Sequence, residues 1–289
     1  MSKVIIIGGG WSGCAAAVSA TKAGGQVTLL ERTDMLLGTG LVGGIMRNNG
    51  RFTAAEELIA LGGGDLFQIC DRTARHQNVD FPGHKHALLY DIKVHGEVLN
   101  YLIQLGVNIV FHARIRNVSM AGQTLLAVKD EQGREFHGDV FIDATGTAGP
   151  QANCTKYGNG CAMCILRCPS FGSRISIAAL AGVEETMAKK ANGGVGAMSG
   201  SCKLNKESLS EEIQQQLNEK GAIVIPVPEK WKKDHLSIKA CQQYNLPTFK
   251  DNIVLLDTGH AKLMTPFFTL ESLRKIPGFE NARYEDPYA

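Results

Sequence analysis

Two short apolar runs near the beginning of the chain flank an alanine-rich segment. The runs KVIII, residues 3–7, and QVTLL, residues 26–30, have the length and apolar content of buried parallel strands. Four alanines between positions 15 and 20 favour a helix, and glycines at positions 24 and 25 end it. The pattern predicts a strand–helix–strand unit in the first 31 residues.

A second group of apolar patterns lies between residues 94 and 149. Residues 94–106 have the pattern of a helix that packs on the sheet, and residues 107–118 that of a strand. Residues 124–149 predict a hairpin with its turn at 130–133, followed by a final strand that ends in DATG at 143–146. This region therefore predicts a small antiparallel sheet and one more strand of the main sheet.

Three glycines follow the first strand with the spacing G-x-G-x-x-G: Gly8, Gly10 and Gly13. The first permits a tight turn, the second allows the backbone to approach a pyrophosphate, and the third allows close packing of helix and strand. The amides at the start of the helix then face the phosphates. Glu31 ends the second strand, where a carboxylate can accept hydrogen bonds from ribose hydroxyls. Together these features predict dinucleotide binding, because a glycine turn alone does not explain the glutamate.

The strand–helix–strand unit, the hairpin and the DATG segment together resemble the glutathione-reductase-like class of FAD-binding folds. The resemblance implies that a β-meander covers the nucleotide, that backbone near Ile115 contacts the adenine, and that residues 144–146 lie close to the cofactor. The resulting candidate cofactor-binding residues are Gly8, Gly10, Trp11, Ser12, Gly13, Glu31, Arg32, Gly38, Thr39, Gly40, Gly43, Ile115, Ala144, Thr145 and Gly146.

Within residues 36–52, the four glycines between positions 38 and 44 are too dense for a helix interior. In the FAD-binding class this segment runs toward the flavin ring, so its backbone could lie against the ring and Arg47, Asn48 or Asn49 could reach ring or substrate. A solvated loop is the alternative. The active dithiol of flavin disulfide reductases occupies this place, and the chain has no cysteine between Cys14 and Cys70.

Further candidates for catalysis are His84 and His86, which could form a metal or acid–base pair or lie in an exposed loop. Cys161, Cys164 and Cys168 form C-x2-C-x3-C-P. With Cys154 or Cys202 as the fourth ligand, they could hold an iron–sulfur cluster or zinc. The alternatives are a redox dithiol of Cys161 and Cys164, or no shared role. The remaining cysteines, Cys14, Cys70 and Cys241, are expected to be buried apolar residues.

The segment IPGFENAR, residues 276–283, together with GGGWSGCAAA near the start, resembles the glucose-inhibited division family of flavoproteins. That resemblance implies FAD, a folate and tRNA wobble-uridine modification. The cysteine run is a departure from the family. A late glycine-rich segment of such flavoproteins would follow the IPG segment, so we expect a fragment, a truncated product or one of two subunits.

Beyond residue 150 we expect helices at 170–191 and 204–220 and strands at 221–228 and 252–259. The predicted fold is therefore α/β: a Rossmann-like parallel sheet with a β-meander, the FAD/NAD(P)-binding fold, plus an inserted substrate or cap region. The expected domains are 1–150 for FAD, 151–250 for the substrate or cap, and 251–289 returning toward the FAD domain.

Net charge is only +2, which gives no bulk electrostatic argument for nucleic acid or membrane. No apolar run reaches membrane-spanning length, so we expect a cytoplasmic protein. The favoured function is an FAD-dependent oxidoreductase that transfers hydride through the flavin to or from an unknown substrate. The alternatives are a tRNA-modifying flavoprotein and a nucleotide-binding subunit that serves a partner chain without activity of its own.

Overall fold

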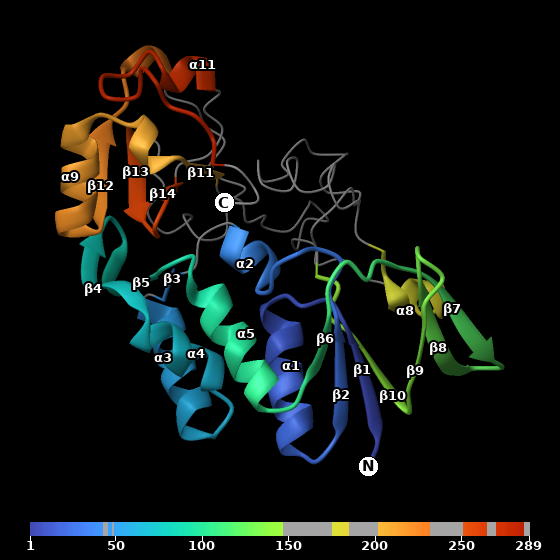
Figure 1. Ribbon diagram of the computed structural model, residues 1–289. Coiled ribbons are helices and arrows are strands. Elements are labelled where there is room, and N and C mark those ends of the chain that lie inside the picture. The colour runs from blue at the N-terminus through green and yellow to red at the C-terminus, as the bar shows by residue number, and fades with distance from the viewer. Residues whose placement is uncertain are drawn as a thin grey trace, which may run out of the picture.

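A parallel sheet forms the centre of the first half of the computed structural model (Figure 1). The structure describes residues 1–42, 46–47, 49–146, 175–184, 202–231, 251–264 and 270–285. The sheet has the order β10-β1-β2-β6, and its strands are β1 (Lys3–Ile7), β2 (Gln26–Leu30), β6 (Asn108–Val110) and β10 (Val140–Asp143). Every pairing is parallel. The carboxyl ends of β1, β2 and β10 therefore meet at one edge, where α/β folds bind ligands.

One face of this sheet is covered by α1 (Trp11–Lys22), α4 (Asp65–Arg72) and α5 (Val94–Gln104). In α5 the buried residues are Val94, Val98 and Leu102, four apart, so they form one apolar face. They share a core with Ile6 and Val18. The helices predicted after the first strand and at residues 94–106 are confirmed as α1 and α5.

The other face is covered by the meander β7 (Ile115–Ala121), β8 (Thr124–Asp130) and β9 (Glu135–His137). Its predicted turn is present, because the Gly133 amide donates to the Asp130 carbonyl oxygen at 3.1 Å. The single strand expected at 107–118 is wrong. The chain bends between β6 and β7, where His112 has a φ of +52° and the Ala113 amide bonds to the Glu31 carbonyl oxygen.

A short helix, α8 (Ile177–Leu180), also belongs to this meander face, since Ile177 packs in its core. A longer helix was expected here, at 170–191. Within the described residues 175–184 the helix ends at Leu180, and Gly182 follows with a φ of +83°, a conformation that ends helices.

A second sheet is antiparallel, with the order β11-β14-β13-β12. Its strands are β11 (Cys202–Leu204), β12 (Ala222–Pro226), β13 (Asn252–Asp257) and β14 (Ala261–Leu263). The helix α9 (Glu211–Lys220) packs on it. This helix is shorter than the expected 204–220: Ser210 caps its first turn, Gly221 ends it, and a 3₁₀ turn, η1 (Lys206–Ser208), precedes it.

A hairpin from the first half of the chain packs against this second sheet. It consists of β4 (Ala74–Phe81) and β5 (His84–Tyr90), with β3 (Met46–Arg47) beside β5. Val79 and Leu89 share a core with Val254 and Leu256. The expected boundary at residue 250 falls inside the second sheet, where β12 pairs with β13. We therefore propose that the hairpin and the strands of the second sheet form one unit.

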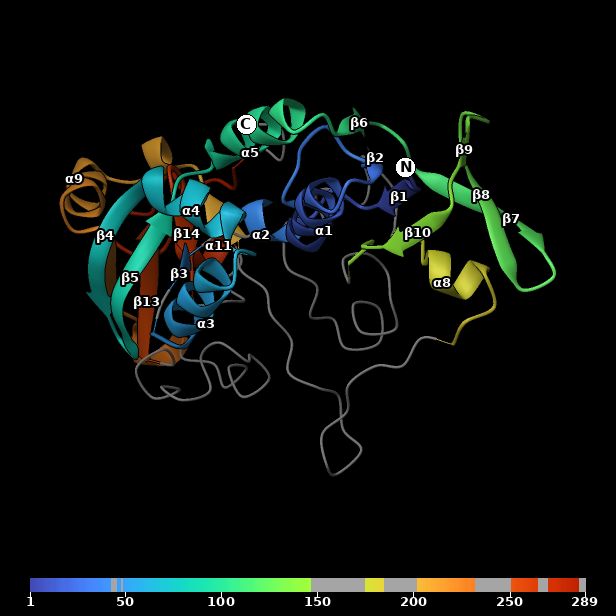
Figure 2. The same cartoon turned by 90° about the horizontal axis from the view of Figure 1, so that it is seen from below.

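The glycine-rich segment contains helices, although its glycine density was expected to exclude a helix interior. The helices are α2 (Gly38–Val42) and α3 (Asn49–Ala60). Two short helices complete the second half, η2 (Glu229–Trp231) and α11 (Leu270–Leu273). Figures 1 and 2 place the meander and the second sheet at opposite ends of the molecule, with α1 between them. Among the described helices, none has the length and hydropathy of a membrane span.

Candidate cofactor site

The turn after β1 brings three chain segments into close contact. Gly8 has a φ of +106°, and a Cβ at this position would lie 2.3 Å from the carbonyl oxygen of Ala144. A Cβ at Gly13 would lie 1.8 Å from the carbonyl oxygen of Gly8. Both contacts are far shorter than any side chain allows, so glycine is required for α1 and the end of β10 to approach the turn.

Gly10 has different surroundings. Apart from its own chain neighbours, no described residue has an atom within 4 Å of the position its Cβ would take. Gly10 is the N-cap of α1, and this helix has neither a side-chain cap nor an acidic residue in its first turn. Among the described residues, no side chain therefore caps its first amides or balances the positive end of its dipole. Such a helix end suits an anion.

Glu31 lies beside this turn, as the motif predicts. It is 5% exposed, and its Oε2 accepts a hydrogen bond from the Gly9 amide at 2.7 Å. Its Oε1 accepts from the Thr33 amide at 2.7 Å. A carboxylate offers about four acceptor positions, so lone pairs remain for ribose hydroxyls. The role of Glu31 in fixing the glycine turn was not predicted.

Residues 36–38 lie against the same turn. The Leu37 amide donates to the Gly9 carbonyl oxygen at 2.8 Å, and Leu37 forms a parallel β-bridge with Gly10. A Cβ on Gly38 would lie 3.2 Å from the Cα of Gly10. The Leu36 amide donates to Nδ1 of His95 at 3.0 Å. The beginning of the glycine-rich segment thus lies against the first glycine turn.

The DATG segment is anchored by Asp143, a role that sequence analysis did not assign. One carboxylate oxygen accepts from the amide and the hydroxyl of Thr145, at 3.0 and 2.6 Å. The other accepts from the amides of Ile177 and Ala178, both at 2.9 Å. Asp143 therefore joins the turn beside Gly8 to the start of α8. The only hint of this role in the sequence is an acidic residue directly before the turn.

The remaining candidate cofactor residues are distributed around this site. Trp11 and Ser12 begin α1, and the Trp11 ring packs against Phe67 of α4 at 5.4 Å between centroids. Arg32 follows Glu31 and is half-buried. Further candidates lie in α2, in β7 and after β10: Thr39, Gly40, Ile115 and Gly146. Gly43 lies outside the described residues.

Arg47 is buried and held by acidic side chains. Its Nη1 donates to Glu56 at 2.8 Å, and its Nη2 pairs with Asp71. Asp71 also accepts from the Tyr90 hydroxyl at 2.9 Å. Burial raises the pKa values of both Asp71 and Tyr90. These contacts explain how the guanidinium of Arg47 can be buried. They place Arg47 in a cluster of paired polar side chains with a structural role.

His84 and His86 occupy different environments. His84 is buried and stacks on Phe81 with 4.3 Å between ring centroids. His86 is exposed, and its φ of +51° turns the backbone between the two histidines. This geometry does not support a shared His–His site. In the described part of the chain, no three His, Cys, Asp or Glu residues are grouped for a metal ion.

The cysteines fall into two groups. Cys14 and Cys70 are buried and free, as expected, and burial raises the pKa of Cys14 to about 12, which makes it unreactive. Several predicted positions lie outside the described residues: Asn48, Cys154, Cys161, Cys164, Cys168 and Cys241. Cys202 begins β11. The predictions for the cysteine run therefore stay predictions.

A buried carboxylate at the end of β13 was not predicted. Asp257 is fully buried and accepts from Nε of Arg75 and Nε2 of His76 at 2.8 Å each, and from Nζ of Lys206 at 3.1 Å. Burial raises the pKa of Asp257, but these hydrogen bonds outweigh it and hold the pKa below its usual value. The register of the β4–β5 pairing shifts on both sides of His76. Since His76 and Asp257 are 181 residues apart, no local pattern could indicate the contact.

Comparison with known proteins agrees with this geometry. The family profile described as glucose inhibited division protein A matches residues 3–254. The structure of GidA from Aquifex aeolicus is 14% identical, covers 99% of this chain and 54% of its own, and has a TM-score of 0.58, which shows the fold. The structure of CtdE in complex with FAD and substrate 4 is 16% identical, covers 54% of this chain and 40% of its own, and has a TM-score of 0.39.

The chain spans about half the length of the GidA structure that it matches. No curated protein matches the chain in sequence. The family profile nevertheless covers most of the 289 residues, including the glycine turn, Glu31 and the DATG segment. The chain therefore belongs to the glucose inhibited division protein A family, a family of FAD-dependent flavoproteins.

Proposed function

We propose that this chain binds the ADP half of FAD at the glycine turn and acts as an FAD-dependent oxidoreductase. The observation that carries the proposal is the hydrogen bond between the Gly9 amide and the buried Glu31 carboxylate. It sets a ribose acceptor directly beside the open N-terminus of α1. Ribose and pyrophosphate are adjacent in ADP, so one nucleotide can use both groups.

Each part of the site has a definite task in this proposal. The first amides of α1 bind the pyrophosphate, and Gly10 leaves room for it. The free lone pairs of Glu31 accept from ribose hydroxyls. Asp143 holds the turn at Ala144 and Thr145 next to Gly8. When bound, FAD supplies hydride or electron transfer, and the protein supplies binding and orientation.

Ligand titration of the protein freed of nucleotide tests this proposal. Fluorescence of FAD and FMN is followed on addition of protein, and unlabelled ADP is used as competitor. We expect binding of FAD, displacement by ADP, and FMN binding at least about tenfold weaker, because FMN lacks the ADP half. A folded protein that binds FMN as well as FAD, or that binds no FAD, would refute the site.

Family membership also favours a second function, a part in FAD-dependent tRNA wobble-uridine modification. The observation is that the family profile extends through residue 254 and so includes β11, β12 and the beginning of β13. Because the chain spans about half of the GidA structure, a further segment or a partner subunit would complete the activity. Filter binding with tRNA at several salt concentrations tests this, and salt-sensitive association is the expected result. FAD binding without tRNA association or turnover would favour the nucleotide-binding subunit instead.

A further inference from the structure

We propose that His95 is a positioning residue for the cofactor site: it holds residues 36–38 against the glycine turn by accepting a hydrogen bond from the Leu36 amide. This inference rests on the proposed binding of FAD at that turn. The contact joins Nδ1 of His95 and the Leu36 nitrogen over 3.0 Å, although the residues are 59 positions apart.

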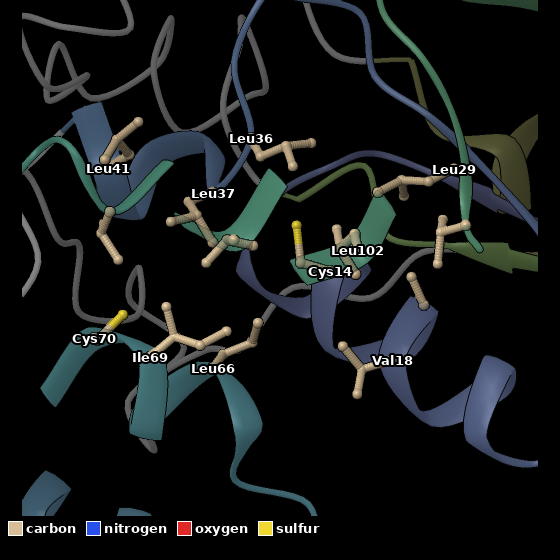
Figure 3. Close-up of a cluster of buried hydrophobic side chains, with 14 of the residues drawn as sticks. Cys14, Val18, Leu29, Leu36, Leu37, Leu41, Leu66, Ile69, Cys70 and Leu102 are labelled. Atoms are coloured by element: carbon tan, nitrogen blue, oxygen red, sulfur yellow. The ribbon is translucent and has the colours of Figure 1, made fainter. Parts of the chain in front are cut away.

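The side chains of this segment are fixed in the core. Leu36 and Leu37 are fully buried and belong to the cluster that contains Cys14 and Leu102. Figure 3 shows them among apolar side chains of α1, α4 and α5. Leu37 has a φ of +68°, which is unfavourable for any residue with a side chain. Such a conformation persists only where its surroundings hold it.

Two amides of the segment donate hydrogen bonds to distant parts of the chain. The Leu37 amide donates to the Gly9 carbonyl oxygen, and the Leu36 amide donates to His95. The Gly9 amide in turn donates to Glu31. His95 thus stands at one end of a series of contacts that passes through the glycine turn and ends at the ribose acceptor.

His95 is itself well placed for this task. It lies in the first turn of α5, whose following residues Val98 and Leu102 are buried against the sheet. Only an unprotonated Nδ1 can accept from an amide, so the ring proton is on Nε2. Burial lowers the pKa of His95, and the nearby Asp34 carboxylate opposes this shift. Burial thus favours the neutral ring that the contact requires.

Removal of the acceptor would leave the amide of a fully buried residue without its partner. A buried donor without a partner is costly, so the segment would shift to satisfy it. That shift would move Leu37 away from Gly9 and disturb the turn that holds the pyrophosphate. We expect FAD affinity to fall by about tenfold or more in His95→Leu.

Two polar variants separate positioning from packing. In His95→Asn the Oδ1 atom has the same place along the side chain as Nδ1, so it can still accept from Leu36. In His95→Gln the acceptor is one bond farther out. We therefore expect His95→Asn to keep FAD affinity within about threefold of the parent, and His95→Gln to resemble His95→Leu.

The experiment measures the dissociation constant for FAD by fluorescence at pH 8, with circular dichroism of the nucleotide-free proteins as the test of folding. Rescue by His95→Asn supports the proposal. Unchanged affinity in His95→Leu, or equal loss in the asparagine and glutamine variants, would overturn it while leaving FAD binding intact. Absence of FAD binding by the folded parent protein would instead overturn the proposed function, and the His95 proposal with it.

Discussion

Replacing Gly13 by alanine should destabilise the protein and abolish FAD binding together. The new Cβ would lie 1.8 Å from the backbone oxygen of Gly8, so α1 must move by more than an ångström to reach an ordinary contact. Overpacking against atoms that cannot rotate away costs about 3 kcal/mol, the upper end of the usual range. Alanine regains about 1 kcal/mol of helix propensity inside α1. The expected net loss is about 2 kcal/mol of unfolding free energy.

Gly10→Ala is the matched control, because its Cβ meets no described atom within 4 Å. The backbone φ of Gly10, −67°, is one that alanine adopts freely, so the loss of stability should be below about 1 kcal/mol. The methyl group nevertheless enters the space assigned to the pyrophosphate. We expect Gly10→Ala to fold normally and to bind FAD at least about tenfold more weakly.

Thermal unfolding of the nucleotide-free proteins and FAD titration of each variant provide the two measurements. The reasoning predicts that Gly13→Ala loses both stability and binding, whereas Gly10→Ala loses binding alone. Normal FAD affinity in Gly10→Ala would show that the open space at the start of α1 is not the pyrophosphate site. Normal stability in Gly13→Ala would refute the argument from the close approach of α1 to Gly8.

Asp257→Asn should lower the unfolding free energy by about 3 kcal/mol. This is the lower end of the range for a broken buried ion pair, because Arg75 is partly exposed. Denaturant unfolding curves of the two proteins provide the measurement. Since the pKa of Asp257 is lowered, the stability it contributes should be present above the unfolded value of about 3.9 and be lost as pH falls through the folded pKa. His95 has the same preference for the deprotonated form, but at higher pH. As pH falls below about 6.5 the unfolded chain binds the proton first, so the parent should lose stability toward the lowered folded pKa of His95, and His95→Asn should lose less over that range. If Cys161 and Cys164 hold a cluster, protein purified without oxygen should contain iron and show a broad absorption that dithionite bleaches, and serine at both positions should remove it; iron-free protein would refute the ligand set.

The local parts of the cofactor site could be predicted from sequence because each depends on neighbours in the chain. The glycine spacing needs only β1 and α1, and Glu31 needs only the end of β2. His95 could not be found this way. Its partner is a backbone amide in a distant loop. Nearly every residue type has a backbone amide, so the sequence does not indicate which one binds His95.

The second half was harder to predict for a related reason. The amphipathic pattern of α9 indicated a helix correctly, but η1 and the serine cap set its actual start. β12 and β13, which lie on either side of the expected boundary at residue 250, pair with each other. Pairing between strands separated by a long segment depends on surfaces that exist only after folding, so apolar periodicity alone cannot indicate the partner.

The packing of the β4–β5 hairpin on β13 has a consequence for biosynthesis. The hairpin leaves the ribosome early, but its apolar face is covered by Val254, Leu256 and Met264. Until residue 256 has been synthesised, Val79 and Leu89 lack their partners Val254 and Leu256 from β13. Long-range contacts of this kind form slowly and leave apolar surface exposed meanwhile. Aggregation during expression should therefore begin at the hairpin, and chaperones that bind exposed apolar strands should protect this stage.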